Sequence, residues 1–91
     1  MKYAFNAARF GLRGWDGQGG VLYDEADSTL YEVSESAFLL LNSLMQQVNP
    51  PSAQELAQEL LGEPPEDVDV SLVTAVLDDF RKMGAVTCLS A

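Results

Sequence analysis

Few side chains in this chain of 91 residues could carry chemistry. It has no histidine and one cysteine, Cys88, which excludes a Ser-His-Asp triad, a Cys-His pair, an imidazole proton shuttle and a histidine-containing zinc site. A lone cysteine also excludes an intramolecular disulfide and a four-cysteine metal site, which fits a reducing compartment. We expect Cys88 to be a small buried residue near an apolar terminus, because no imidazole can activate it.

Two carboxylate pairs remain as candidates for metal binding or acid–base work, Asp67 with Asp69 and Asp78 with Asp79. Helix capping and a solvated helix face explain both pairs more simply. The glycine-rich tract 17–20 has the composition of a phosphate-binding loop, but such a loop leads into a helix and here a strand is expected to follow. The sequence therefore predicts a turn at this tract and a protein that is not an enzyme, with no catalytic residue, metal or cofactor.

Composition and charge restrict the class of protein further. With 47% hydrophobic and 21% charged residues and a mean hydropathy of zero, the chain is expected to form one domain, ordered over about residues 9–89. Fourteen acidic residues against five basic ones give a net charge of −9, which disfavours nucleic acid as a partner. The longest apolar run, 37–41, is too short for a membrane span, and the first ten residues lack a secretory apolar core. We therefore expect a cytoplasmic protein without a membrane partner.

Residues 9–33 predict β structure, because short runs rich in β-branched and aromatic residues alternate with turn formers. Three strands are expected, at 10–15, 21–23 and 29–33. The glycine tract and the polar segment 24–27 supply the two reversals between them. These elements form an antiparallel meander, although Gly11 and Gly14 weaken the first strand.

From Ser34 the apolar period changes from two to about 3.6, which predicts a helix with Ser34 as its N-cap. The segment Asn49-Pro50-Pro51 ends this helix. A second helix starts at once, since Ser52 and Glu55 have the spacing of a capping box, and it ends at Gly62.

A third helix is expected after the connector 63–66, capped by Asp67 or Asp69 and ended by Gly84. Its apolar residues form a wide stripe: Val70, Leu72, Val73, Val76, Leu77, Phe80 and Met83. Residues 85–89 would finish as a short extended tail. Strands and helices are segregated along the chain, which predicts an α+β fold, winged-helix-like, with a three-stranded antiparallel meander followed by three helices.

The order of these pieces over about residues 12–89 resembles the PqqD-like family. The matching pieces are Val21-Leu22-Tyr23-Asp24, Leu30 to Ala37, Ser52-Ala53-Gln54-Glu55-Leu56 and Phe80 to Val86. Ser34 stands where the family usually has Asn or Asp, and all three are good N-caps. Trp15-Asp16 also resembles a subgroup paired with relatives of the kinase that phosphorylates the phosphocarrier HPr.

The resemblance implies that residues 1–91 are one PqqD-like peptide-binding domain, a RiPP recognition element or peptide chaperone. Such a domain presents a precursor's leader peptide to a separately encoded modifying enzyme, for example a radical enzyme, a cyclase or a kinase-like protein. The leader adds as an extra strand beside the third strand and rests on the third helix. Segment 29–33 agrees with this, because it has no proline or lysine to block its edge. The predicted peptide-binding residues are Thr29, Leu30, Tyr31, Glu32, Val33, Leu72, Val73, Val76, Leu77 and Phe80.

Several alternatives stay open. The apolar residues of the third helix could simply be core, and Glu32 could protect the strand edge. The same edge could hold a second copy in a homodimer, or make the chain a structural subunit of an enzyme. A winged-helix transcription regulator is a further alternative, although the third helix carries more aspartates than basic residues. Trp15 is either an interface anchor or a core residue. The acidic surface predicts a basic partner and salt-sensitive association.

Overall fold

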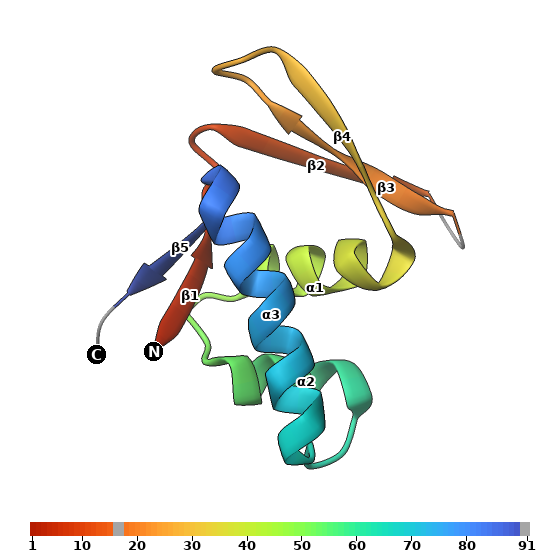
Figure 1. Cartoon of the computed structure of the whole chain (residues 1–91), viewed down its shortest axis with the longest axis vertical. Helices are drawn as coiled ribbons and strands as arrows, with labels where there is room; N and C mark the ends of the chain where they lie inside the picture. The colour runs from red at the N-terminus through yellow and green to blue at the C-terminus, as the bar shows by residue number, and fades with distance from the viewer. Residues whose placement is uncertain (16–17, 90–91) are drawn as a thin grey trace.

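The computed structural model describes residues 1–15 and 18–89; Asp16 and Gly17 of the predicted turn lie outside the described residues. Within those ranges the chain forms five strands and three helices (Figure 1). The strands are β1 (Lys2–Phe5), β2 (Phe10–Trp15), β3 (Gly19–Asp24), β4 (Thr29–Val33) and β5 (Val86–Leu89). The helices are α1 (Glu35–Gln46), α2 (Ala53–Leu61) and α3 (Asp67–Met83).

The predicted fold class is confirmed. Strands β2, β3 and β4 form an antiparallel sheet in that order, and the three helices follow them along the chain. The bounds of β2 and β4 agree with the sequence prediction, whereas β3 is longer and includes both Gly19 and Gly20. Gly19 has a φ of 78°, a left-handed conformation that suits glycine and closes the β2–β3 hairpin.

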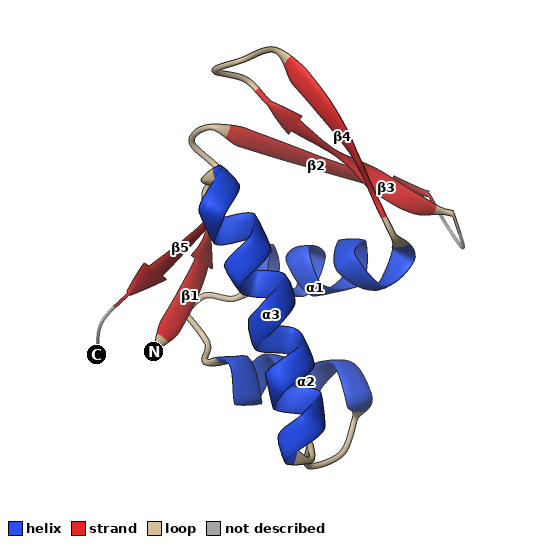
Figure 2. Ribbon diagram, in the orientation of Figure 1, coloured by secondary structure: helices blue, strands red, loops and turns tan. Residues whose placement is uncertain are grey.

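A second sheet pairs the two ends of the chain. β1 runs antiparallel to β5, with Lys2 opposite Leu89 and Phe5 opposite Val86, so the first and last strands lie side by side (Figure 2). The sequence pattern predicts no strand at residues 2–5 and only an extended tail at 85–89. The strands β1 and β5 are each only four residues long, and neither is followed by a hairpin turn that would indicate its partner at the other end of the chain.

The glycines of β2 and β3 have a packing role. Gly14 and Gly20 lie opposite each other, and the ring of Phe38 from α1 lies against both. A methyl group at Gly14 would collide with that ring, and one at Gly20 would lie 2.8 Å from its Cδ1 atom. The glycine pair therefore lets α1 approach the sheet closely.

The helix ends mostly follow the predicted caps. The Ser34 hydroxyl accepts a hydrogen bond from the Ala37 amide at 3.2 Å, and Ser52 and Glu55 form the expected capping box. Helix α1 ends at Gln46, before the predicted stop at residues 49–51.

The predicted cap of α3 is wrong, because the N-cap is Glu66, which lies one residue before Asp67 and three before Asp69. The Asp69 carboxylate instead accepts from the Glu66 amide at 2.9 Å, so it stabilises the helix start from within the first turn. None of the described helices is long and apolar enough to cross a membrane.

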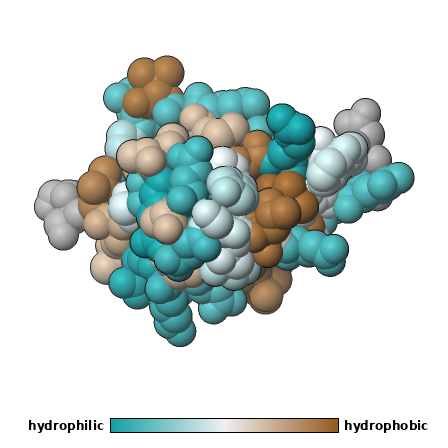
Figure 3. Space-filling model, turned by 90° about the horizontal axis from the view of Figure 1, so that it is seen from above, coloured by the Kyte–Doolittle hydropathy of each residue, from teal (hydrophilic) through white to brown (hydrophobic). Residues whose placement is uncertain are grey.

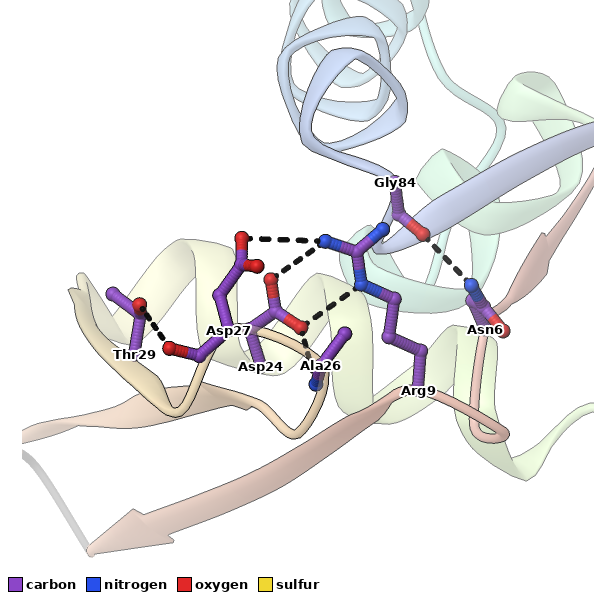
Figure 4. A network of polar contacts seen from close by, with 7 residues as sticks. All are labelled: Asn6, Arg9, Asp24, Ala26, Asp27, Thr29 and Gly84. Carbon is purple, nitrogen blue, oxygen red and sulfur yellow. Dashed lines mark hydrogen bonds and ion pairs between the residues drawn. The ribbon is translucent and has the colours of Figure 1, made fainter.

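One core joins the sheets and the helices. Its most deeply buried side chains come from β3, α1, α2, α3 and β5: Leu22, Leu41, Leu56, Leu77 and Val86. Polar contacts add a connection at the sheet's end (Figure 4), where the Asn6 side chain donates to the Gly84 carbonyl at 3.0 Å. This contact ties the segment before β2 to the end of α3.

Candidate functional site

Strand β4 forms one edge of the three-stranded sheet. It pairs with β3 from Asp24 opposite Thr29 to Gly20 opposite Val33, and no strand among residues 1–15 and 18–89 pairs with its other side. An open edge of this kind presents main-chain donors and acceptors to another extended chain.

The ladder pattern identifies which groups of β4 face outward. The Glu25 amide donates to the Arg9 carbonyl at 2.9 Å. In the β2–β3 register these two residues lie opposite each other, so they form a hydrogen-bonded pair. Hydrogen-bonded and non-bonded pairs alternate along antiparallel strands, so Asp24, Leu22 and Gly20 direct their main-chain groups to β4. Their partners Thr29, Tyr31 and Val33 are engaged with β3. The amides and carbonyls of Leu30 and Glu32 therefore point to the open edge.

The side chains of β4 alternate between the two faces of the sheet. Tyr31 and Val33 pack against the core, whereas Leu30 is 64% exposed and Glu32 is exposed on the opposite face. Tyr23, the β3 partner of Leu30, is also exposed. Figure 3 looks down on the top of the molecule as drawn in Figure 1, and it shows hydrophobic side chains in separate patches on a largely hydrophilic surface.

An apolar groove continues from the end of β4 along the helices. It has a volume of about 230 Å³ and lies between the start of α1, the end of α2 and the middle of α3. A second hollow of about 170 Å³ shares Leu60, Leu72 and Val73 with it, so the two make one continuous surface. The lining residues of the groove are Ser34, Ser36, Ala37, Leu40, Leu60, Leu72, Val73 and Val76.

The structure separates the predicted α3 residues into two groups. Leu72, Val73 and Val76 line the groove, and Leu72 is 62% exposed. The assignment of Leu77 to the binding surface is wrong, because its side chain has no exposed surface and belongs to the core. Phe80 is half-buried against the core and does not line the groove.

Sequence reasoning missed the groove residues that come from α1 and α2. The sequence places Ala37, Leu40 and Leu60 on the apolar faces of their helices, but it does not show that they line a groove. The helical period shows which face is turned inward, but not which inward residues remain accessible beside a gap between helices.

Trp15 is 52% exposed at the end of β2, so the alternative that it fills the core is excluded. The carboxylates have local partners: Asp69 caps α3, and Asp78 lies 3.5 Å from Arg81 one turn along the same helix. Across the described ranges no cluster of three or more histidine, cysteine or acidic residues has the geometry of a metal site. The site is thus an edge and a groove that can hold an extended chain.

Comparison with known proteins finds no matching protein-family model and no significant match among curated proteins. Among solved structures, the chain is similar to one described as "Lasso peptide synthetase B1 complexed with the leader peptide". The TM-score is 0.71, with 17% sequence identity, and the match covers 97% of this chain and 100% of that chain. At this identity the match shows a shared fold.

Proposed function

We propose that this protein is a non-enzymatic adaptor that captures a leader peptide by strand addition at β4 and presents it to a separate modifying enzyme. The observation that carries the proposal is the open edge of β4 beside a continuous apolar groove. Main-chain pairing supplies affinity in this mode of recognition, and pockets for alternate side chains supply specificity.

Two further observations support the proposal. The solved structure with the same fold is described as a complex with a leader peptide, and it matches over nearly the whole chain. The resemblance to the PqqD-like family rests on different evidence, the order of sequence pieces, and implies the same strand edge. The proposed binding surface consists of Thr29–Val33 together with Leu72, Val73 and Val76.

The substitution Leu30→Pro tests strand addition directly. The Leu30 amide points to the open edge, so proline removes a donor for the peptide without removing a hydrogen bond to β3. Candidate peptides encoded next to this gene are titrated by calorimetry against the wild type, Leu30→Pro and the control Leu30→Ala. We expect Leu30→Pro to lower affinity about tenfold or more, since it blocks main-chain pairing, and Leu30→Ala to have a smaller effect.

Amide hydrogen exchange on the unmodified protein gives a second, independent measurement. Bound peptide should protect the Leu30 and Glu32 amides, which face the edge, and leave the already paired Tyr31 amide unchanged. A peptide that binds a folded Leu30→Pro variant as tightly as the wild type would refute strand addition. Sedimentation over a range of concentrations would reveal the rival outcome, in which a second copy of the chain fills the edge.

A further inference from the structure

The outer face of the three-stranded sheet is organised in rows that cross the strands. Arg13, Val21 and Glu32 lie opposite one another in one row. The neighbouring row contains Gly11, Tyr23 and Leu30. One row therefore ends at the open edge in a carboxylate, and the other ends in an apolar side chain.

A strand added beside β4 extends these two rows. It would lie about 4.8 Å from β4 and place one side chain next to Glu32 and another next to Leu30, two positions apart. The residue between them would face inward, as Tyr31 does, toward the core. This relation between the three positions holds for either direction of the added strand, because side chains alternate in both.

Glu32 has no opposite charge to neutralise it within the parts of the chain that the structure describes. No ion pair involves its carboxylate, and its neighbour on β3 is Val21. Arg13 is the next residue in the row, two strand spacings or about 10 Å away. The protein as a whole carries a charge of −9. A basic side chain beside Glu32 would be attracted both by its carboxylate and by the surrounding field, whereas an acidic one would be repelled.

Beside Leu30 the preference is of another kind. Leu30 and its partner Tyr23 are exposed, and together with Gly11, Leu12, Arg13 and Val21 they line a shallow hollow of about 340 Å³. An apolar side chain next to Leu30 would cover this surface and remove apolar area from water.

Building on the proposed function, we infer that Glu32 and Leu30 select a peptide in which a basic and an apolar residue lie two positions apart, with a further apolar residue between them. The outer apolar residue lies beside Leu30, the middle residue faces inward, and the lysine or arginine pairs with Glu32. Along the peptide the order is apolar, apolar, basic for a parallel strand and basic, apolar, apolar for an antiparallel one. The rival explanation is that Glu32 only prevents unwanted edge pairing, in which case no charge preference exists at that position.

Selection from a displayed library of short random peptides tests the inference. The library is selected on the wild type, on Glu32→Lys and on the control Glu63→Lys, which makes the same change of charge in the exposed connector before α3. Peptides that also bind the Leu30→Pro variant are discarded, so that the remaining peptides are those that bind by pairing with the edge of β4. We expect lysine or arginine two positions from an apolar residue on the wild type and on Glu63→Lys, and aspartate or glutamate at that position on Glu32→Lys.

Synthetic peptides from the selection then give the size of the effect. Replacing the basic residue by glutamate should weaken binding to the wild type by about two- to fivefold, and should strengthen binding to Glu32→Lys. Edge-binding peptides whose charge preference is unchanged in Glu32→Lys would overturn this inference and leave the adaptor function standing. Failure to select any edge-binding peptide on the wild type would overturn both.

Discussion

The guanidinium group of Arg9 donates two hydrogen bonds to the buried carboxylate of Asp24, from Nε at 2.9 Å and from Nη2 at 2.8 Å (Figure 4). The same carboxylate accepts from the Ala26 amide at 3.0 Å. Asp24 thus connects the residue before β2 with the turn that leads into β4. Because β4 is the proposed peptide edge, this ion pair fixes the position at which the edge begins.

Stability at acid pH should report on this contact. The hydrogen bonds from Arg9 hold the pKa of Asp24 below its ordinary value of 3.8. A carboxyl group whose pKa is lower in the folded state than in the unfolded state stabilises the protein fully when the pH is above its unfolded-state pKa. This contribution is lost as the pH falls through its folded-state pKa. We therefore expect Asp24→Asn to be less stable than the wild type at neutral pH, and the difference to shrink below pH 3.8.

Urea unfolding midpoints measured from neutral to acid pH give this difference. Asp27→Asn is the matched control, because Asp27 is exposed and lies farther from Arg9, at 3.6 Å. A difference between Asp24→Asn and the wild type that stays constant down to the lowest pH would contradict the assignment.

The glycine pair beneath Phe38 should be intolerant of even one methyl group. Gly14→Ala is expected to destabilise the protein by roughly 1–3 kcal/mol, since the ring must move to make room. Gly11→Ala is the control in the same strand, because a methyl group there meets no atom within 4 Å. Chemical denaturation compares the two. The double variant Gly14→Ala, Phe38→Leu should recover part of the loss, and equal stability of the two single variants would show that Phe38 does not constrain Gly14.

Two leucines on α3, one in the core and one in the groove, should separate folding from binding. Leu77→Ala is expected to cost about 2–5 kcal/mol of unfolding free energy, because it leaves a cavity in the core. Leu72→Ala should change stability by less than about 0.5 kcal/mol and weaken peptide binding, because Leu72 is exposed in the groove.

Val68→Ala controls for apolar exposure on the same helix, since Val68 is exposed but lies outside the groove lining. Stability is measured by denaturation and affinity by calorimetry with the same peptide. If Leu72→Ala and Val68→Ala bind the peptide equally well, the groove does not contact it.

Local signals in the sequence predicted much of the fold. Caps at Ser34 and Ser52 and left-handed glycines at 62 and 84 act within a few residues, so they can be read from a single segment. The pairing of β1 with β5 depends on contacts between opposite ends of the chain, and no local pattern encodes it. The close approach of Phe38 to Gly14 also depends on residues that are distant in the sequence. From the sequence alone, Gly14 is only a residue that disfavours a strand.

The site could be predicted only in part, because local patterns indicate its strand edge but not its groove. Alternation along residues 29–33 distinguishes the two faces of β4, and the order of the strands makes β4 an edge. On α3 the apolar stripe contains both groove and core residues, and the helical period does not separate them: Val76 lines the groove, while the adjacent Leu77 is buried. That division depends on where α1 and α2 pack, which is a tertiary property.

The pairing of β1 with β5 also determines how the domain could be joined to other polypeptides. Lys2 lies opposite Leu89, so a host chain can enter and leave through two adjacent strands, as an inserted module requires. Neither strand contributes a residue to the groove lining or to the β4 edge. Fusion through these ends, or circular permutation with a short linker across them, would therefore leave the proposed peptide site unobstructed.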